Sequence, residues 1–253
     1  MNSWLLLNSG KCGAALNMAL DEALLENVSQ IGAPVLRFYG WTEPAATFGY
    51  FQKHADVERA TLLRPLVRRP TGGGIVPHDA DWTYSLAFPP GNEWYLLKAE
   101  ESYRRVHDWQ RRAFAELKIE SELAPCCKKL PPMIRSSRRE EAPSPSGISQ
   151  SLLTSAATGQ CFSGHEKFDL LWRGKKIAGA AQRRNKLGLL IQGSVQPPPV
   201  SLKRADWENA MLTVAGKYCS CRWSNFSPDA KLLERSAELA REKYSRADYN
   251  RKR

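Results

Sequence analysis

The sequence predicts an α+β protein with a mixed, largely antiparallel sheet flanked by helices. Segments with strand character follow one another in neighbouring runs, and helical segments lie between these groups. The regular strand–helix alternation of a doubly wound parallel sheet is absent. With 253 residues, 42% of them hydrophobic and 25% charged, the chain can bury a substantial core without disulfide staples. We expect one domain that covers residues 1–253.

Hydrophobic spacing assigns the elements of the first half of the chain. Residues 15–28 have the spacing of an amphipathic helix, and strands are expected at 34–40, 45–52 and 82–90. Segment 66–78 is expected to form a strand, a glycine loop and a second strand. The longest helix is expected at 94–118, and its buried stripe would consist of Leu96, Ala99, Tyr103, Val106, Ala113, Phe114 and Leu117.

The second half of the chain begins with a change of character. Residues 125–160 are rich in proline, serine and charge, which predicts a long irregular loop, with 125–155 its least regular part. Residues 168–184 are expected to form a hairpin that turns at Arg173-Gly174, followed by a strand at 187–195. A short helix is expected near Asp206, and a last helix after Ser227-Pro228.

The charge balance points to acidic partners. The 37 basic and 26 acidic residues give a net charge of +11, which suits nucleic acid, an anionic membrane, an acidic protein or a phosphorylated cofactor. No apolar run approaches the roughly 18 residues of a membrane span, and no signal peptide is evident. The six cysteines form no CxxC pair. We therefore expect a cytoplasmic protein with free thiols, no membrane association and no metal site.

The strongest chemical signal is the run RRPTGGGIVPHD at 68–79. Three consecutive glycines, Gly72, Gly73 and Gly74, let a backbone approach a ligand and present its N–H groups to an anion. Arg69 and its neighbour Arg68 add charge-assisted donors for a carboxylate, a phosphate or a thioester carbonyl. A flexible surface loop would explain the same residues, and the run matches neither a P-loop nor a dinucleotide fingerprint.

Two further segments carry candidate chemistry. In GKKIAGAAQRR (174–184), Lys176 lies on an expected strand among small residues, from which it could reach into a cleft; a charged hairpin turn is the simpler explanation. Cys161 lies at the end of the irregular segment, and a thiolate there could attack a thioester. An isolated cysteine is more often an inert, small apolar residue.

Together, RRPTGGGIVPHD, GKKIAGAAQRR and QGSV (192–195) resemble the biotin/lipoate protein ligase superfamily, on its lipoate side. MALDEALL (18–25), RFYGW (37–41) and GYFQ (49–52) fit the same pattern, and residues 243–253 are similar to the C-terminus of octanoyltransferases. The resemblance implies a single catalytic domain of the class II synthetase and biotin ligase type. Such a domain transfers an octanoyl or lipoyl group to a lysine of an acidic lipoyl domain, in a 2-oxoacid dehydrogenase or the glycine cleavage system.

Two chemistries of this family remain open. An octanoyltransferase of the type first known from Gram-positive bacteria takes the acyl group from acyl carrier protein through an acyl-cysteine, without a cofactor. A lipoate–protein ligase uses free lipoate, ATP and Mg²⁺ through a lipoyl-adenylate. The context of Cys161 and the chain length favour the transferase, whereas Gly74 stands where such transferases often have arginine. The transferase is our prediction and the ligase its alternative.

The resemblance also implies roles for individual residues. Cys161 and Lys176 would be catalytic. His78 and Asp79 are expected to orient the loop, with proton transfer as their alternative role. The residues expected to bind substrate are Arg69, Thr71, Gly72, Gly73, Gly74, His78, Gly179, Gln182 and Gly193. A biotin ligase is disfavoured because its GRGR-type loop is missing. A nucleic-acid-binding module is the outsider, supported by the charge and the eight tryptophans.

Overall fold

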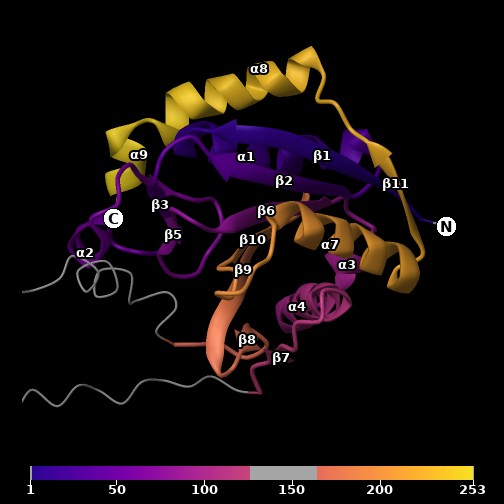
Figure 1. The fold of residues 1–253 in the computed structure, drawn as a ribbon. Coiled ribbons are helices and arrows are strands. Elements are labelled where there is room, and N and C mark those ends of the chain that lie inside the picture. The colour runs from indigo at the N-terminus through magenta and orange to yellow at the C-terminus, as the bar shows by residue number, and fades with distance from the viewer. Residues whose placement is uncertain (1, 126–163, 253) are drawn as a thin grey trace, which may run out of the picture.

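The structure is a computed structural model that describes residues 2–125 and 164–252. Cys161 and most of the predicted irregular segment lie outside these residues. The α+β fold is confirmed: an eight-stranded sheet and a three-stranded sheet are flanked by helices (Figure 1). None of the helices in the described ranges is long and apolar enough to cross a membrane.

The large sheet is mixed and largely antiparallel, as predicted. Its strand order is β11-β1-β2-β6-β10-β9-β8-β7. Strand β1 pairs in parallel with β2 and β11, and the other neighbours are antiparallel. The strands are β1 (Asn2–Cys12), β2 (Val35–Trp41), β6 (Trp82–Phe88), β7 (Glu122–Leu123), β8 (Leu170–Trp172), β9 (Lys175–Asn185), β10 (Gly188–Val195) and β11 (Cys221–Asn225).

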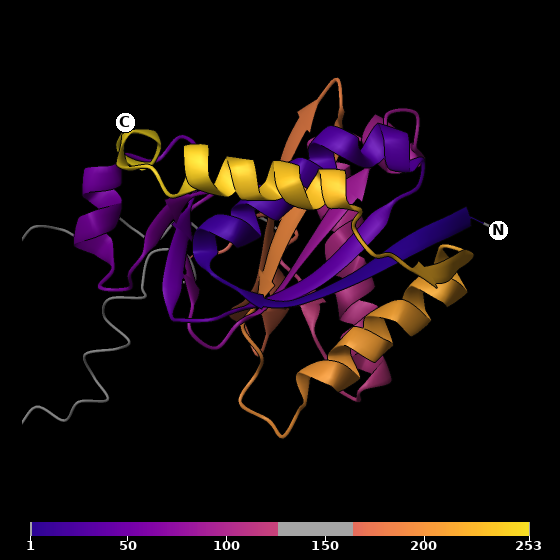
Figure 2. The ribbon, with the colours of Figure 1, turned by 90° about the horizontal axis from the view of Figure 1, so that it is seen from above.

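Helices cover both faces of this sheet, as Figures 1 and 2 show. On one face, α1 packs against α8; on the other, α4 packs against α7. Each face has its own apolar cluster, one containing Leu24 and Leu232 and the other containing Trp109 and Trp207. The helices are α1 (Ala14–Ile31), α3 (Glu93–Leu96), α4 (Ala99–Glu116), α7 (Arg204–Tyr218) and α8 (Ala230–Leu239).

The small sheet holds the glycine motif. Its order is β4-β3-β5, and the chain from β4 to β5 carries the three glycines. The end of the chain packs here, because α9 contacts both α2 and β4. These elements are β3 (Ala45–Phe48), β4 (Leu66–Arg68), β5 (Val76–His78), α2 (His54–Ala60), the π-helical turn η1 (Ala240–Tyr244) and α9 (Ala247–Arg251).

Some element boundaries differ from the prediction. The helix expected at 94–118 is two helices, because Leu97 and Lys98 are extended between α3 and α4. Leu96, predicted to be buried, is 71% exposed, since it ends α3 and does not share a face with α4. The last helix starts after Asp229, whose side chain accepts the N–H of Leu232, so the cap is not Ser227.

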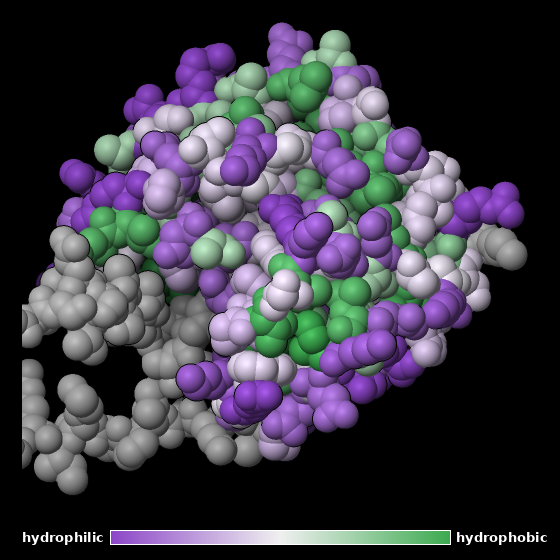
Figure 3. Space-filling model, in the orientation of Figure 1, coloured by the Kyte–Doolittle hydropathy of each residue, from purple (hydrophilic) through white to green (hydrophobic). Residues whose placement is uncertain are grey.

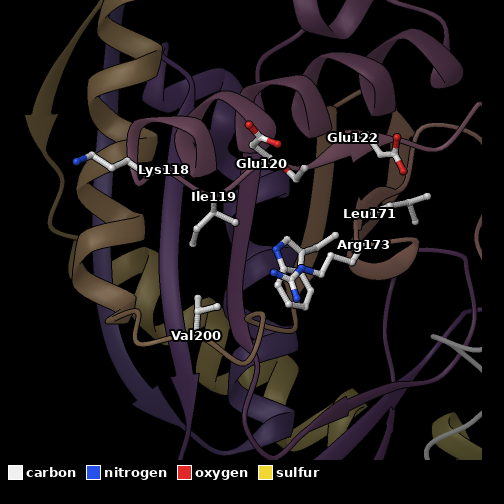
Figure 4. Close-up of a pocket in the computed structure, with 9 residues that line it drawn as sticks. Lys118, Ile119, Glu120, Glu122, Leu171, Arg173 and Val200 are labelled. Carbon is white, nitrogen blue, oxygen red and sulfur yellow. The ribbon is translucent and has the colours of Figure 1, made fainter.

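The surface in the orientation of Figure 1 is mostly hydrophilic, with apolar patches between the charged side chains (Figure 3). A hollow of about 600 Å³ opens where the end of α4 meets β7 and β8. Figure 4 shows Ile119, Val200 and Arg173 around it. None of the predicted site residues that lie within 2–125 and 164–252 lines this hollow.

Candidate active site

The glycine loop has a defined shape because its neighbours hold it. The Arg69 side chain folds back, and its Nε and Nη2 donate to the carbonyl oxygen of Gly72 at 3.0 and 2.5 Å. Gly73 has a φ of +86°, a left-handed conformation that favours glycine. Arg69 is only 5% exposed, so its cationic group belongs to the loop and not to the outer surface.

A fourth glycine, Gly49, directly follows β3 and lets the chain pass close to the glycine loop. The chain after Phe48 runs beside the loop, with the N–H of Tyr50 donating to the carbonyl of Thr71 at 2.9 Å. A Cβ atom on Gly49 would lie 2.0 Å from the carbonyl oxygen of Gly73. Only a glycine at position 49 allows this approach of two backbones. The strand expected at 45–52 ends at Phe48 because the chain then turns, with the N–H of Gln52 donating to the carbonyl of Gly49 at 3.0 Å.

Lys176 is held in place by a buried carboxylate. Its Nζ lies 2.7 Å from Oδ2 of Asp169, and the two side chains are 12% and 7% exposed. The end of the Lys176 side chain lies over Gly179, where a Cβ atom would stand 2.8 Å from the lysine Cε. The same oxygen of Asp169 accepts the N–H of Glu166 at 2.7 Å. The Asp169 carboxylate therefore links the Lys176 ammonium to the backbone of Glu166.

The glycine loop and Lys176 lie on one face of the sheet. A Cβ atom on Gly73 would be 3.6 Å from Cβ of Ala181 on β9. Ala181 and Gly179 are two residues apart on that strand, so they share a face and lie about 7 Å apart. The fold thus brings together the glycines at 72–74 and the Lys176 side chain, which are about 100 residues apart in sequence.

His78 is locked by contacts on three sides. Its Nδ1 lies 2.9 Å from Oδ2 of Asp81, and its Nε2 lies 2.8 Å from Oγ1 of Thr47. The indole of Trp41 stacks on the ring at 3.7 Å between centroids. Oγ1 of Thr47 also lies 3.5 Å from Nη1 of Arg69, so His78 is linked to the loop. Asp79, by contrast, is exposed.

Gln182 and Gly193 are not brought to the glycine loop. Oε1 of Gln182 accepts the hydroxyl of Ser102 on α4 at 2.8 Å, on the opposite face of β9 from Ala181. The space over Gly193 is filled by the ring of Tyr84, since a Cβ atom there would be 2.1 Å from Cζ of the ring. The neighbouring Gln192 faces the loop instead, because its Oε1 accepts the hydroxyl of Thr71 at 2.7 Å.

His107 is a buried imidazole behind the Asp169–Lys176 pair. Burial lowers its pKa to about 4, Asp169 raises that pKa and Lys176 lowers it. The backbone of Phe168 also raises it, by less than either charge changes it. The ring is therefore neutral at physiological pH. Lys176, and not His107, is the cation that pairs with the Asp169 carboxylate.

The comparisons with known proteins bear on the identity of this site. Residues 13–196 match the model of the lipoyl protein ligase A/B catalytic domain. The chain belongs to this family. It is 34% identical over 197 residues to octanoyltransferase LipM of Geobacillus kaustophilus, covering 76% of this chain and 64% of that protein. Against octanoyltransferase LipM of Lysinibacillus sphaericus the identity is 33% over 201 residues, covering 77% and 66%. The chain thus spans just under two thirds of these relatives.

Solved structures of the family share the fold. A lipoate-protein ligase A bound with ATP superposes with a TM-score of 0.70 at 20% identity, covering 99% of this chain and 98% of that one. The ligase of an archaeal lipoylation system from Thermoplasma acidophilum gives 0.68 at 17% identity, covering 99% and 97%. These likenesses confirm the predicted ligase-like fold.

The residues that hold the site in place were not predicted from the sequence. Asp169 and Gln192 stand inside or beside the quoted motifs, and Gly49 begins the GYFQ segment, so the signal was adjacent in each case. Cys161 lies outside the described residues, and its role stays a prediction.

Proposed function

We propose that this family member transfers an octanoyl group from acyl carrier protein to a lysine of a lipoyl-carrier domain, through an acyl-enzyme on Cys161. Residues 1–253 would act as a single catalytic domain. The observation that carries the proposal is the identity of 32–34% to octanoyltransferases over three quarters of this chain. The position of Lys176 on the same sheet face as the glycine loop supports it.

The first step forms the acyl-enzyme. The Cys161 thiolate attacks the carbonyl carbon of the thioester, a new carbon–sulfur bond forms, and the carrier's thiolate leaves and takes up a proton. We assign to the N–H groups of Gly72, Gly73 and Gly74 the stabilisation of the negative charge on the carbonyl oxygen. Loss of one such donor typically costs about 10²–10³ in rate.

The second step releases the product. The neutral amine of the target lysine attacks the acyl-cysteine, the amide bond forms, and the Cys161 thiolate leaves while the amine nitrogen loses a proton. The ammonium group of Lys176 supplies positive charge for the carbonyl oxygen or for the thiolate in both steps. Asp169 keeps this ammonium over Gly179.

The chain connection is compatible with this role for Cys161. Cys161 precedes Glu166 by five residues, and the N–H of Glu166 is bonded to the carboxylate that holds Lys176. Because five residues span at most about 18 Å, the connection permits a thiol at position 161 to approach Lys176.

Among the predicted substrate-binding residues, the geometry supports a local role for most. Arg69, Thr71 and His78 hold the loop, and Gly179 leaves room for Lys176. Gln182 and Gly193 remain proposals, and their contacts are with α4 and Tyr84.

Intact-protein mass spectrometry tests the acyl-enzyme. The protein is mixed with octanoyl-acyl carrier protein in the absence of ATP, and we expect a mass gain of one octanoyl group. The Cys161→Ser variant should show no thioester adduct, and Lys176→Ala should form it far more slowly. An adduct that persists in Cys161→Ser would refute the assignment of the nucleophile.

The ligase alternative is tested in the same samples. A lipoate–protein ligase would modify a lipoyl domain only when free lipoate, ATP and Mg²⁺ are supplied, and Cys161→Ser would leave it active. Gly74 favours this alternative, because the resemblance at this position is greater to the ligases than to the transferases. Modification that requires ATP and does not require Cys161 would replace the transferase with the ligase.

A further inference from the structure

A chain of buried hydrogen bonds connects the glycine loop to the centre of the protein. The hydroxyl of Thr71 donates to Oε1 of Gln192 at 2.7 Å, and Nε2 of Gln192 donates to Oδ2 of Asp21 on α1 at 2.7 Å. Thr71 and Asp21 are fully buried, and Gln192 is 7% exposed. The first residue of the loop is thus tied to a carboxylate of α1, which packs on the same face of the sheet.

The direction of each bond in this chain is determined. A carboxylate only accepts, so the amide nitrogen of Gln192 must face Asp21 and its oxygen must face Thr71. The hydroxyl of Thr71 is therefore the donor of this bond, and it points toward Gln192 on β10. The negative charge of Asp21 fixes the amide nitrogen of Gln192, and Gln192 therefore presents its oxygen to Thr71 as an acceptor.

Asp21 itself cannot turn, because each of its oxygens has two partners. Oδ1 accepts Nη1 of Arg37 at 2.7 Å and the hydroxyl of Ser85 at 2.6 Å. Oδ2 accepts Gln192 and the hydroxyl of Tyr39, the latter at 3.0 Å. Burial, with the charge of Asp21, raises the pKa of Tyr39 well above its ordinary value, so Tyr39 stays a neutral donor.

We propose that Gln192 and Asp21 are positioning residues for the acyl-transfer site, which aim the glycine loop through Thr71. The proposal rests on the function proposed above. The loop is then held at three successive residues: Thr71 by Gln192, the Gly72 carbonyl by Arg69, and Gly73 by its contact with Gly49. Hydrogen-bond donors stabilise a developing oxyanion only when their positions are fixed before the reaction. The three contacts that hold Thr71, Gly72 and Gly73 would fix the loop N–H groups in this way.

A double-mutant cycle between Thr71 and Gln192 tests the proposal. The variants are Thr71→Val, Gln192→Leu and the pair together, each measured for kcat, KM and melting temperature with octanoyl-acyl carrier protein and a lipoyl domain. We expect each single variant to lower kcat by about 10- to 100-fold, because a misplacement of about 1 Å costs that much, with KM changed far less. The double variant should be no slower than the slower single variant, since both act through one bond.

Two further variants separate positioning from general destabilisation. Thr71→Ser keeps the hydroxyl and should restore most of kcat. Trp109→Phe removes a buried hydrogen bond, from Nε1 to the carbonyl oxygen of Met211 at 2.7 Å, between α4 and α7 on the other face of the sheet, so it should lower the melting temperature while kcat stays near wild type.

The outcomes are distinct from failure of the proposed function. If wild type itself transfers no octanoyl group, the proposed function is wrong. If wild type is active and Gln192→Leu retains its kcat, the positioning role is refuted. Losses that multiply in the double variant would also overturn it, because Thr71 would then act on the substrate independently of Gln192. A kcat in Trp109→Phe as low as that in Gln192→Leu would reduce the role of Gln192 to stability alone.

Discussion

Replacing Gly49 with alanine is the sharpest test of how the glycine loop is supported. The new Cβ atom would stand 2.0 Å from the carbonyl oxygen and 2.9 Å from the carbonyl carbon of Gly73. Real contacts of this kind are not shorter than 3.0 Å, so the Gly73 carbonyl must retreat by at least about 1 Å. Both partners are backbone, and no side chain can turn aside to relieve the contact.

The size of the effect follows from that displacement. Shifting catalytic groups by about 1 Å can cost on the order of 10² in rate, so we expect kcat for octanoyl transfer to fall about 100-fold. Overpacking in a buried position typically costs about 1–3 kcal/mol, so the protein should still fold. The assay is single-turnover acylation followed by mass spectrometry, with a denaturant titration of the same variant.

A matched control is available on α7. A Cβ atom on Gly216 would meet nothing closer than 3.8 Å, and the residue lies inside a helix. Gly216→Ala should leave kcat unchanged and raise stability, by up to about 1 kcal/mol. If Gly49→Ala acylates at the wild-type rate, the glycine loop does not need its observed position, and the role assigned to its N–H groups is refuted.

Three further perturbations address other parts of the site. Gly179→Ala places a methyl group 2.8 Å from Cε and 3.0 Å from Nζ of Lys176. Because the end of a lysine side chain moves easily, stability should be unchanged while kcat falls about 10-fold or more, and a wild-type kcat would show that the position of Lys176 is unimportant. The second perturbation is pH, since burial lowers the pKa of His107 to about 4 and the unfolded chain protonates this ring below about pH 6.5. Stability present above pH 6.5 is therefore lost as the pH falls towards 4, by about 2 kcal/mol between pH 7 and pH 5. Urea titrations of wild type and His107→Gln at both pH values measure this, and equal losses in the two proteins would contradict it. Third, Asn250→Ala removes the acceptor that takes the buried N–H of Arg68 at 2.8 Å, which should cost about 1–3 kcal/mol of unfolding free energy. An unchanged denaturation midpoint would show that α9 does not anchor β4.

The sheet and most helices could be predicted from the sequence because their signals are local. Short runs rich in apolar residues marked β2, β6 and β10, and the turn at Arg173-Gly174 is present, with positive φ at both residues. Strand β1 was missed because its burial does not alternate: Trp4 and Leu7 are buried, whereas Leu5 and Leu6 are only half-buried. The break between α3 and α4 was missed because the helical spacing continues from Leu96 to Ala99, although Leu97 and Lys98 between them are extended.

The active site was predictable only in part, and the pair Gln192 and Gly193 shows why. Both stand in the same short motif, QGSV, and the family resemblance pointed to the glycine. On a strand, neighbouring residues point to opposite faces, so one step in register decides which of the two meets the loop. That register is set by pairing with β6 and β9, which places Gly193 opposite Tyr84 and Gln192 opposite Ala181. Ala181 lies under Gly73, so the glycine loop meets the face that carries Gln192. Residues that bind through a motif can be recognised one segment at a time. The residues that hold a motif in place depend on which distant strands lie beside it, and that information belongs to the fold.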